Sequence, residues 1–243
     1  MSYRAPLVVP ALKKHTATVI MAHGLGDSGA GWAGLAQNWR RRNKFEEVSF
    51  IFPNAPSIPI TVNMGMSMPG WYDIPHLGRD LDFEEAQRNQ DEPGILKSRD
   101  YFENLIKAEI EKGIDPSRIV LGGFSQGGAM SLFTGITSSH KLGGIFGLSC
   151  YLLLSTKIKE FSPEGELPNQ NTPFFLAHGR DDPVVLYEFG DMTQKLLKDF
   201  GLNVDFRGYR GLGHSADPDE LEDLEKFIAK VLPPTSTGDA AGL

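Results

Sequence analysis

The sequence predicts a single-domain protein of the α/β class, with a mostly parallel sheet covered by helices on both faces. Short apolar runs alternate along the chain with longer segments whose apolar residues recur at helical spacing, which is the pattern of repeated β-α units. A chain of 243 residues, 40% hydrophobic, can bury one substantial core, and no Pro/Ser-rich linker divides it. We therefore expect one folded domain over residues 1–232 and a small, polar, disordered tail over 233–243.

The predicted strands are short apolar runs rich in β-branched and aromatic residues, such as Thr18 to Ala22. They cover residues 18–23, 47–52, 118–123, 144–150, 173–178 and 203–209. Thr61 and Val62 could add a short piece. The rest of the segment between Pro53 and Pro75 contains few helix formers, so we expect a loop there.

The predicted helices are longer segments with apolar residues at spacings of three and four. They cover residues 30–42, 94–112, 126–138, 187–200 and 217–231. In the second, the stripe comprises Phe102, Leu105, Ile106 and Ile110, and in the last Leu221, Leu224, Phe227, Ile228 and Val231. We interpret these stripes as core faces.

The strand predicted at 118–123 leads directly into a candidate nucleophile. Gly123-Phe124-Ser125-Gln126-Gly127 has the G-x-S-x-G pattern, between an apolar run and a helical one. Acyl-transfer enzymes place a serine at such a tight strand-to-helix turn so that its hydroxyl projects into a cleft. Flanking glycines avoid collisions with neighbouring backbone. The alternative is a structural glycine turn.

The base expected with this turn is a histidine that follows an acid in the chain order Ser, Asp or Glu, His. His140 lies in a polar stretch before any candidate acid, so a surface position is the better interpretation. His178 ends a predicted strand and precedes the candidate acids, so local hydrogen bonding at the strand end is expected. His214 remains, in a Gly-rich turn after the last predicted strand, where catalytic side chains of open α/β sheets converge. The alternative for His214 is a capping or core histidine.

The acid should follow the strand at 173–178. Asp181 and Asp182 are adjacent there and compete for the role. Because consecutive side chains diverge, we expect only one of them to reach the histidine ring. Position alone leaves the choice open.

The loop after the first predicted strand, 23–29, is rich in glycine and could direct a backbone N–H at a developing oxyanion. We expect Leu25 to supply this donor and Gln126, the residue after the serine, to supply the second. The alternative is a tight connection without such a role. His23 is expected to brace the loop.

Charge and cysteine content exclude several classes of function. Lys and Arg number 24 against 31 Asp and Glu, a net charge of −7, which disfavours a general nucleic-acid-binding surface. Cys150 is the single cysteine and is expected to be a buried structural thiol. No zinc spacing, dinucleotide fingerprint or P-loop is present, so we expect no cofactor and no metal. We expect a cytoplasmic location, with the nucleus as an addition.

Seven motifs, spread over nearly the whole chain, carry a family resemblance. They read HGLGDSGAGW (23–32), FPNAP (52–56), MPGWYDI (68–74), GGFSQGGAMSL (122–132), GLSCYL (147–152), HGRDDPVV (178–185) and GLGHS (211–215). In these motifs the sequence closely resembles the acyl-protein thioesterases of the phospholipase/carboxylesterase branch of α/β hydrolases. It departs from them in the segment 75–92, which is long and acidic and is expected to affect how protein substrates approach.

The resemblance implies an α/β-hydrolase fold and maps the family's catalytic triad onto Ser125, Asp182 and His214, because the family's acid directly precedes a Pro-Val pair. It also supports Leu25 and Gln126 as oxyanion donors. The implied activity is removal of long acyl chains such as palmitoyl from thioester-linked cysteines of proteins. Two alternatives are a general carboxylesterase or lysophospholipase acting on oxygen esters, and a non-catalytic binding protein, which a missing triad residue would favour.

Candidate acyl-binding residues lie in loops over the expected site. They are Met66, Trp71, Leu153 and Leu186. The alternative for the methionine-rich and aromatic loop is that its side chains fill the core. The partners implied are S-acylated proteins, with lysophospholipids or small esters as further substrates, transient contact with a membrane surface, and a monomer or weak homodimer.

Overall fold

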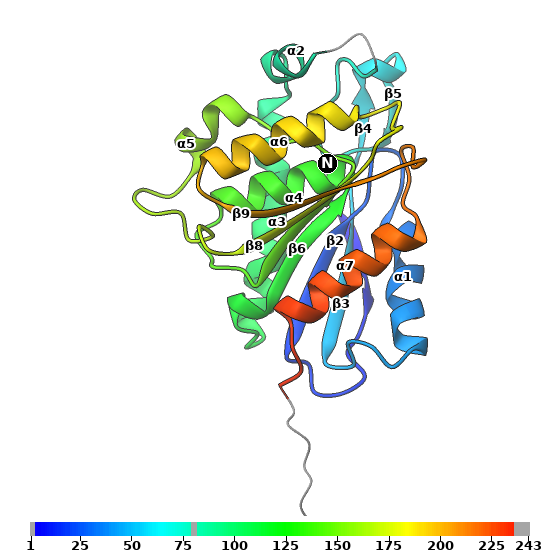
Figure 1. Ribbon diagram of the computed structural model, residues 1–243, viewed down its shortest axis with the longest axis vertical. Coiled ribbons are helices and arrows are strands. Elements are labelled where there is room, and N and C mark those ends of the chain that lie inside the picture. The colour runs from blue at the N-terminus through cyan, green and yellow to red at the C-terminus, as the bar shows by residue number, and fades with distance from the viewer. Residues whose placement is uncertain (1–2, 79–81, 236–243) are drawn as a thin grey trace, which may run out of the picture.

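The computed structural model describes residues 3–78 and 82–235 (Figure 1). Its main sheet has seven strands: β1 (Arg4–Val9), β2 (Ala17–Ala22), β3 (Val48–Asn54), β6 (Ile119–Phe124), β7 (Gly144–Leu148), β8 (Pro173–Gly179) and β9 (Asn203–Tyr209). Their order is β1-β3-β2-β6-β7-β8-β9. Only β1 is antiparallel to its neighbour in this sheet. The predicted, mostly parallel α/β architecture is therefore confirmed.

Helices cover both faces of the sheet. One layer consists of α1 (Gly29–Arg41) and α7 (Pro218–Val231), whose buried residues share one apolar cluster with strand residues such as Val19 and Phe146. The other consists of α3 (Glu92–Glu111), α4 (Gln126–Thr137), α5 (Ile158–Phe161) and α6 (Tyr187–Asp199), which pack on Ile20 and Leu121. Central strands are continuous apolar runs because both of their faces are buried.

The segment expected to be a loop between Pro53 and Pro75 contains a β-hairpin instead. Strand β4 (Ser57–Ile60) pairs antiparallel with β5 (Met66–Pro69) in a separate two-stranded sheet. The short piece expected at Thr61 and Val62 is part of a 3-10 turn, Thr61–Asn63. Each strand has four residues and contains a proline, so neither forms an apolar run long enough to detect. Met64 and Gly65, both with positive φ, close the connection.

The acidic segment 75–92 contains a short helix, α2 (Phe83–Arg88), that was not predicted. The Asp82 carboxylate accepts the Glu85 N–H, and the Glu85 carboxylate accepts the Asp82 N–H, which forms a capping box. The Gln87 amide fastens this helix to the loop after β7 by donating to the Leu152 carbonyl. A helix of six residues is too short to show periodicity.

The predicted tail begins at residue 233, and its part from 236 to 243 lies outside the described residues. Residues 233–235, the first part of this predicted tail, are hydrogen-bonded to the folded domain. Thr235 donates from its N–H and its hydroxyl to Glu47, and the Pro233 carbonyl accepts from Arg118. The folded region therefore extends past the expected boundary at residue 232.

The carboxyl ends of the parallel strands meet at one edge of the sheet, and the loops that leave them converge there. The loop after β2 carries 23–28, the turn after β6 carries Ser125, and the loops after β8 and β9 carry 180–186 and 210–217. These are the segments in which the candidate catalytic residues were predicted.

Candidate active site

Ser125 occupies a strained turn between β6 and α4. Its φ is 52° and its ψ −123°, a backbone conformation that L-residues rarely adopt and that turns its side chain out of the strand direction. Close packing explains the glycines on either side. A Cβ on Gly123 would lie 2.5 Å from the Ala22 carbonyl oxygen, and one on Gly127 would lie 2.4 Å from the same atom. Larger residues would therefore force the turn away from β2.

Three side chains form a hydrogen-bonded chain at this turn. Ser125 Oγ lies 2.9 Å from His214 Nε2, and His214 Nδ1 lies 2.7 Å from Asp182 Oδ2. A carboxylate only accepts hydrogen bonds, so neutral His214 carries its proton on Nδ1. Its Nε2 is then free to accept the proton of the serine hydroxyl. The structure thus brings together the three residues that sequence reasoning selected as nucleophile, base and acid.

The two adjacent aspartates point in different directions and contact different groups. The Asp182 side chain is fully buried, and its second oxygen, Oδ1, accepts the N–H groups of Val184 and Val185 at 2.8 and 3.0 Å. Asp181 is exposed and accepts the Gly211 N–H at 2.6 Å. Asp182 therefore orients His214, whereas Asp181 fastens the loop that carries it.

The other two histidines after Ser125 have local contacts. His178 is buried and donates from Nε2 to the Val185 carbonyl at 2.8 Å, and burial lowers the pKa of its imidazole. His140 packs in the loop before β7, where its carbonyl accepts from Asn169. His178 lies 3.6 Å from Asp182, so its neutral ring supports the acid without competing for it.

The loop after β2 is held by His23. Its Nδ1 donates to the Gly24 carbonyl at 2.7 Å, and its Nε2 accepts the Ala55 N–H at 3.1 Å. The Gly24–Leu25 peptide is trans, so the Leu25 N–H points opposite to the Gly24 carbonyl. Burial lowers the pKa of the His23 imidazole, which keeps the ring in the neutral form that this bonding requires. The expected bracing role of His23 accords with these contacts.

Both candidate oxyanion donors border the same cavity as Ser125. The cavity has a volume of about 410 Å³, within the usual range for ligand sites. Gln126 is the first residue of α4, so its N–H has no partner within the helix. Apolar side chains form much of the wall: Leu25, Trp32, Ile74, Leu77, Val184 and Val185, with Tyr72 and Tyr151.

All four predicted acyl-binding residues lie outside the lining of this cavity. Met66 is 52% exposed on the β4–β5 hairpin, whereas Trp71 and Leu153 are buried in the core. Trp71 donates from Nε1 to the His23 carbonyl and packs edge-on against Phe102, so it supports the loop from behind. Leu186 lines a small cavity that shares Tyr151 and Val184 with the main one.

Sequence reasoning missed two features that support the site: the hydrogen bonds of the Gln126 side chain and the ring of Phe124. The Gln126 side chain accepts the Trp71 N–H at 2.7 Å and donates to the Tyr72 carbonyl at 2.6 Å, which places Tyr72 on the cavity wall. Phe124 lies between Trp32 and His214, at ring-centre distances of 5.4 and 4.9 Å. Phe124 occupies the first variable position of the G-x-S-x-G motif. A large aromatic side chain at that position is the sequence signal by which its role could have been found.

Glu220 is an unpartnered carboxyl behind the site. It is fully buried near the start of α7, and neither of its oxygens has a hydrogen-bond partner among the described residues. Burial, with the nearby charges of Asp217 and Asp182, raises the pKa of Glu220 from 4.5 to about 8. The group therefore stays protonated in the folded protein at neutral pH.

Glu220 should make stability depend on pH. Between pH 4.5 and 8 the unfolded chain loses the Glu220 proton while the folded chain keeps it, so the stability contributed by the protonated group is lost as the pH rises. We expect Glu220→Gln to remove this loss, with a relative gain on the order of 2–5 kcal/mol between pH 5 and 9. Urea unfolding of both proteins across this range measures it. A stability difference that does not change with pH would contradict the raised pKa.

Cys150 is buried, as expected, and burial raises the pKa of its thiol, which suppresses the reactive thiolate. Within residues 3–78 and 82–235, no three His, Cys, Asp or Glu side chains gather in a way that could hold a metal ion. In the same part of the chain, no helix combines the length and apolar character needed to cross a membrane.

Comparison with known proteins identifies the family. Residues 4–232 match the sequence profile of the Phospholipase/Carboxylesterase family. The chain belongs to this family. Acyl-protein thioesterase 1 of Emericella nidulans is 69% identical over 236 residues, which cover 97% of this chain and 98% of that protein. Acyl-protein thioesterase 1 of Yarrowia lipolytica is 46% identical over 226 residues, which cover 90% of this chain and 94% of that protein.

Similar solved structures agree with the fold. The crystal structure of Zea mays acyl-protein thioesterase 2 superposes with a TM-score of 0.79 at 29% identity, covering 95% of this chain and 100% of that one. Arabidopsis thaliana SOBER1 gives a TM-score of 0.80 at 32% identity, covering 89% and 99%. The α/β-hydrolase fold implied by the sequence motifs is confirmed, and the protein is a hydrolase of this family.

Proposed function

We propose that this hydrolase removes acyl chains from thioester-linked cysteines of proteins through an acyl-serine intermediate, with Ser125, His214 and Asp182 as its triad. The observation that carries the proposal is the hydrogen-bonded chain from Ser125 to Asp182, which opens onto an apolar cavity. The names of the relatives support the thioester as the substrate.

In the acylation step, Ser125 Oγ attacks the thioester carbonyl carbon while its proton passes to His214 Nε2. The buried carboxylate of Asp182 stabilises the imidazolium that forms. The N–H groups of Leu25 and Gln126 donate to the oxyanion of the tetrahedral intermediate. Collapse of this intermediate breaks the carbon–sulfur bond, and His214 returns the proton to the leaving thiolate. In deacylation a water molecule attacks the ester carbonyl carbon while its proton passes to His214 Nε2. His214 then returns this proton to Ser125 Oγ as the ester bond breaks, which releases the fatty acid and restores the serine.

The acyl chain is assigned to the apolar end of the cavity, where Leu77, Tyr151 and Val184 lie. These side chains take the place of the predicted Met66, Trp71 and Leu153. A small neighbouring cavity of about 10 Å³ is lined by Leu186 and Phe189. The exposed hairpin side chains Met64 and Met66 support transient contact with a membrane surface, from which an acylated substrate would be drawn.

Leu77→Gln should reduce chain-length selectivity. Each additional buried methylene contributes at most about 0.8 kcal/mol, so kcat/KM should climb by up to about fourfold per methylene from short to medium acyl chains. A polar side chain in the wall should flatten this climb and leave short-chain hydrolysis intact. Kinetics on a thioester series with a fixed thiol, from butyryl to palmitoyl, measure the slope.

Met66→Gln is the matched control, because it makes a similar exchange on a side chain outside the cavity. Its slope should equal that of the wild type. An unchanged slope in a stably folded Leu77→Gln protein would remove this wall from the acyl site. Parallel measurements on oxygen esters of the same acyl chains test the alternative, since faster cleavage of oxygen esters than of thioesters would favour a carboxylesterase or lysophospholipase.

The proposed place of action is the cytoplasm. Cys150 forms no disulfide, which accords with a reducing compartment. The proposed macromolecular partners are S-acylated proteins, and no feature of the site calls for a nucleic acid.

A further inference from the structure

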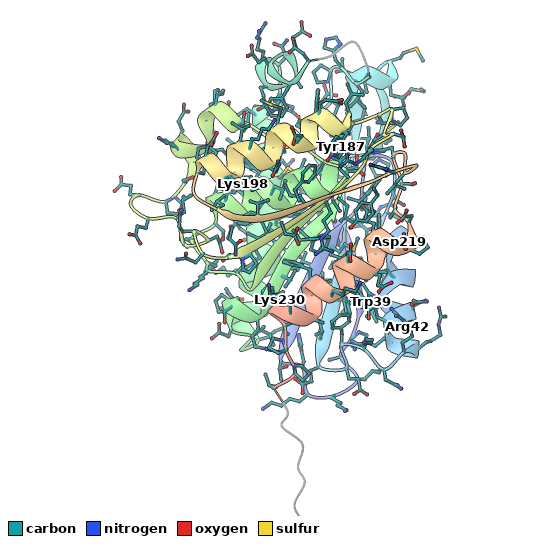
Figure 2. All side chains as sticks on the ribbon, in the orientation of Figure 1. Trp39, Arg42, Tyr187, Lys198, Asp219 and Lys230 are labelled. Carbon is teal, nitrogen blue, oxygen red and sulfur yellow. The ribbon has the colours of Figure 1, made fainter. Side chains whose placement is uncertain are left out.

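A second hollow of about 900 Å³ lies between helices α1 and α7. Gly31 and Trp32 border both this hollow and the cavity at Ser125, so the two hollows adjoin at these residues. Figure 2 shows the helices that form its walls side by side, with Trp39 and Arg42 labelled on α1 and Asp219 and Lys230 on α7. We call this hollow the α1–α7 groove.

The groove is open because α1 presents a small residue to it. A Cβ built on Gly34 would meet no atom within 4 Å. Leu35 and Leu221 supply apolar surface on opposite walls, and Trp39 lies beneath with 2% of its surface exposed. The apolar floor and the free space can accommodate the side chains of an extended polypeptide.

Charges at the far end of the groove are already paired. Glu225 forms ion pairs with Arg42 and Lys44, and Lys226 lies 2.9 Å from Glu222. Each charged side chain that lines the groove has an ion-pair partner, so an anionic ligand such as a phosphate would have to compete with these carboxylates for the basic side chains. A neutral polypeptide with apolar side chains fits this surface better.

The side from which the thiol leaves the carbonyl carbon also favours a polypeptide in the groove. The two arms of a thioester, the acyl chain and the thiol, must leave the carbonyl carbon on opposite sides. The acyl arm occupies the apolar end at Leu77 and Tyr151, so the sulfur faces His214, which returns its proton. Ser215 and Ala216 continue from His214 on the cavity wall toward α7, and Trp32 continues on α1. The polypeptide that carries the cysteine therefore leaves toward the groove.

We propose that the α1–α7 groove binds the polypeptide segment next to the acylated cysteine of the substrate. This rests on the proposed thioesterase function and adds where the protein part of the substrate docks. The 13 residues of α1 span about 20 Å, and an extended peptide covers about 3.3 Å per residue. About six residues on one side of the cysteine are enough to reach the far end.

Filling the groove with Gly34→Trp tests the proposal. Two substrates carry the same palmitoyl thioester, one on a central cysteine of a 13-residue peptide and one on N-acetylcysteamine, a small thiol that does not reach the groove. We expect kcat/KM for the peptide to fall about tenfold or more, and that for the small thioester to stay within about twofold of the wild type. Gln37→Trp adds the same side chain to an exposed α1 position outside the groove, and both substrates should be cleaved as by the wild type.

Equal turnover of the peptide thioester by wild type and a folded Gly34→Trp protein would overturn the proposal. Lack of thioester cleavage by the wild type would instead overturn the proposed function. If Gly34→Trp does not fold, photo-crosslinking decides the question. A non-hydrolysable palmitoyl peptide with a photoreactive residue four positions from the cysteine should crosslink to α1 or α7 of Ser125→Ala protein, and crosslinks confined to other elements would overturn the groove assignment.

Discussion

Ser125→Ala should abolish turnover, with kcat reduced on the order of 10³-fold or more, while the protein stays folded. The hydroxyl is the group that forms the acyl intermediate, and its only side-chain hydrogen bond in the described structure is the one to His214. The backbone of the turn is fixed by other contacts, including the Ser125 N–H to the Leu148 carbonyl at 2.8 Å. Loss of the oxygen therefore removes chemistry and little packing. Steady-state kinetics on a palmitoyl thioester measure the loss.

Fluorophosphonate labelling is the companion measurement, because this probe reacts with activated serines. The wild type should be labelled at Ser125, and the alanine variant should be unlabelled with an unchanged melting temperature. Retained activity together with labelling of a different serine would place the nucleophile elsewhere.

Asp182→Asn should reduce kcat by about 10³ to 10⁴-fold, because an amide cannot stabilise the imidazolium and can favour the wrong tautomer of His214. The buried Asp182 Oδ2 lies 2.7 Å from His214 Nδ1, and both neighbouring backbone donors remain available to an amide oxygen. The variant should therefore keep its fold and lose its chemistry.

Asp181→Asn is the matched control, since it makes the same exchange one residue away on an exposed side chain. Among the residues that the structure describes, its carboxylate accepts only the Gly211 N–H, a bond that an amide oxygen can replace, so activity should stay within several-fold of the wild type. If Asp181→Asn proved the more damaging variant, the assignment of Asp182 would be wrong.

The fold could be predicted from the sequence wherever an element had a long or repeated pattern. Six of the seven strands of the main sheet and five long helices were found within a few residues, because parallel strands rich in apolar residues and amphipathic helices leave clear signals. Strand β1, the β4–β5 hairpin and the short helices α2 and α5 were missed. Their stability comes from pairing and anchoring contacts, such as that of Gln87 with Leu152, and local sequence does not record these.

The candidate triad could be selected from chain order and motif, but the cavity wall could not. Trp71 and Tyr72 are adjacent and both aromatic, yet Trp71 packs into the core and Tyr72 faces the cavity. Which of the two faces inward depends on the hydrogen bonds of the Gln126 side chain, which comes from another part of the chain. A wall built by loops distant in sequence can be recognised only once they are placed together in space.

Trapping the intermediate tests the account most directly. The wild type is mixed with a palmitoyl-cysteine peptide, quenched in acid during the first turnover, digested and analysed by mass spectrometry. We expect a palmitoyl group on Ser125, formed as fast as the free thiol peptide is released, and absent from Ser125→Ala. Release of the thiol peptide without acylation of Ser125, or a palmitoyl group on another residue of the wild type in its place, would contradict it.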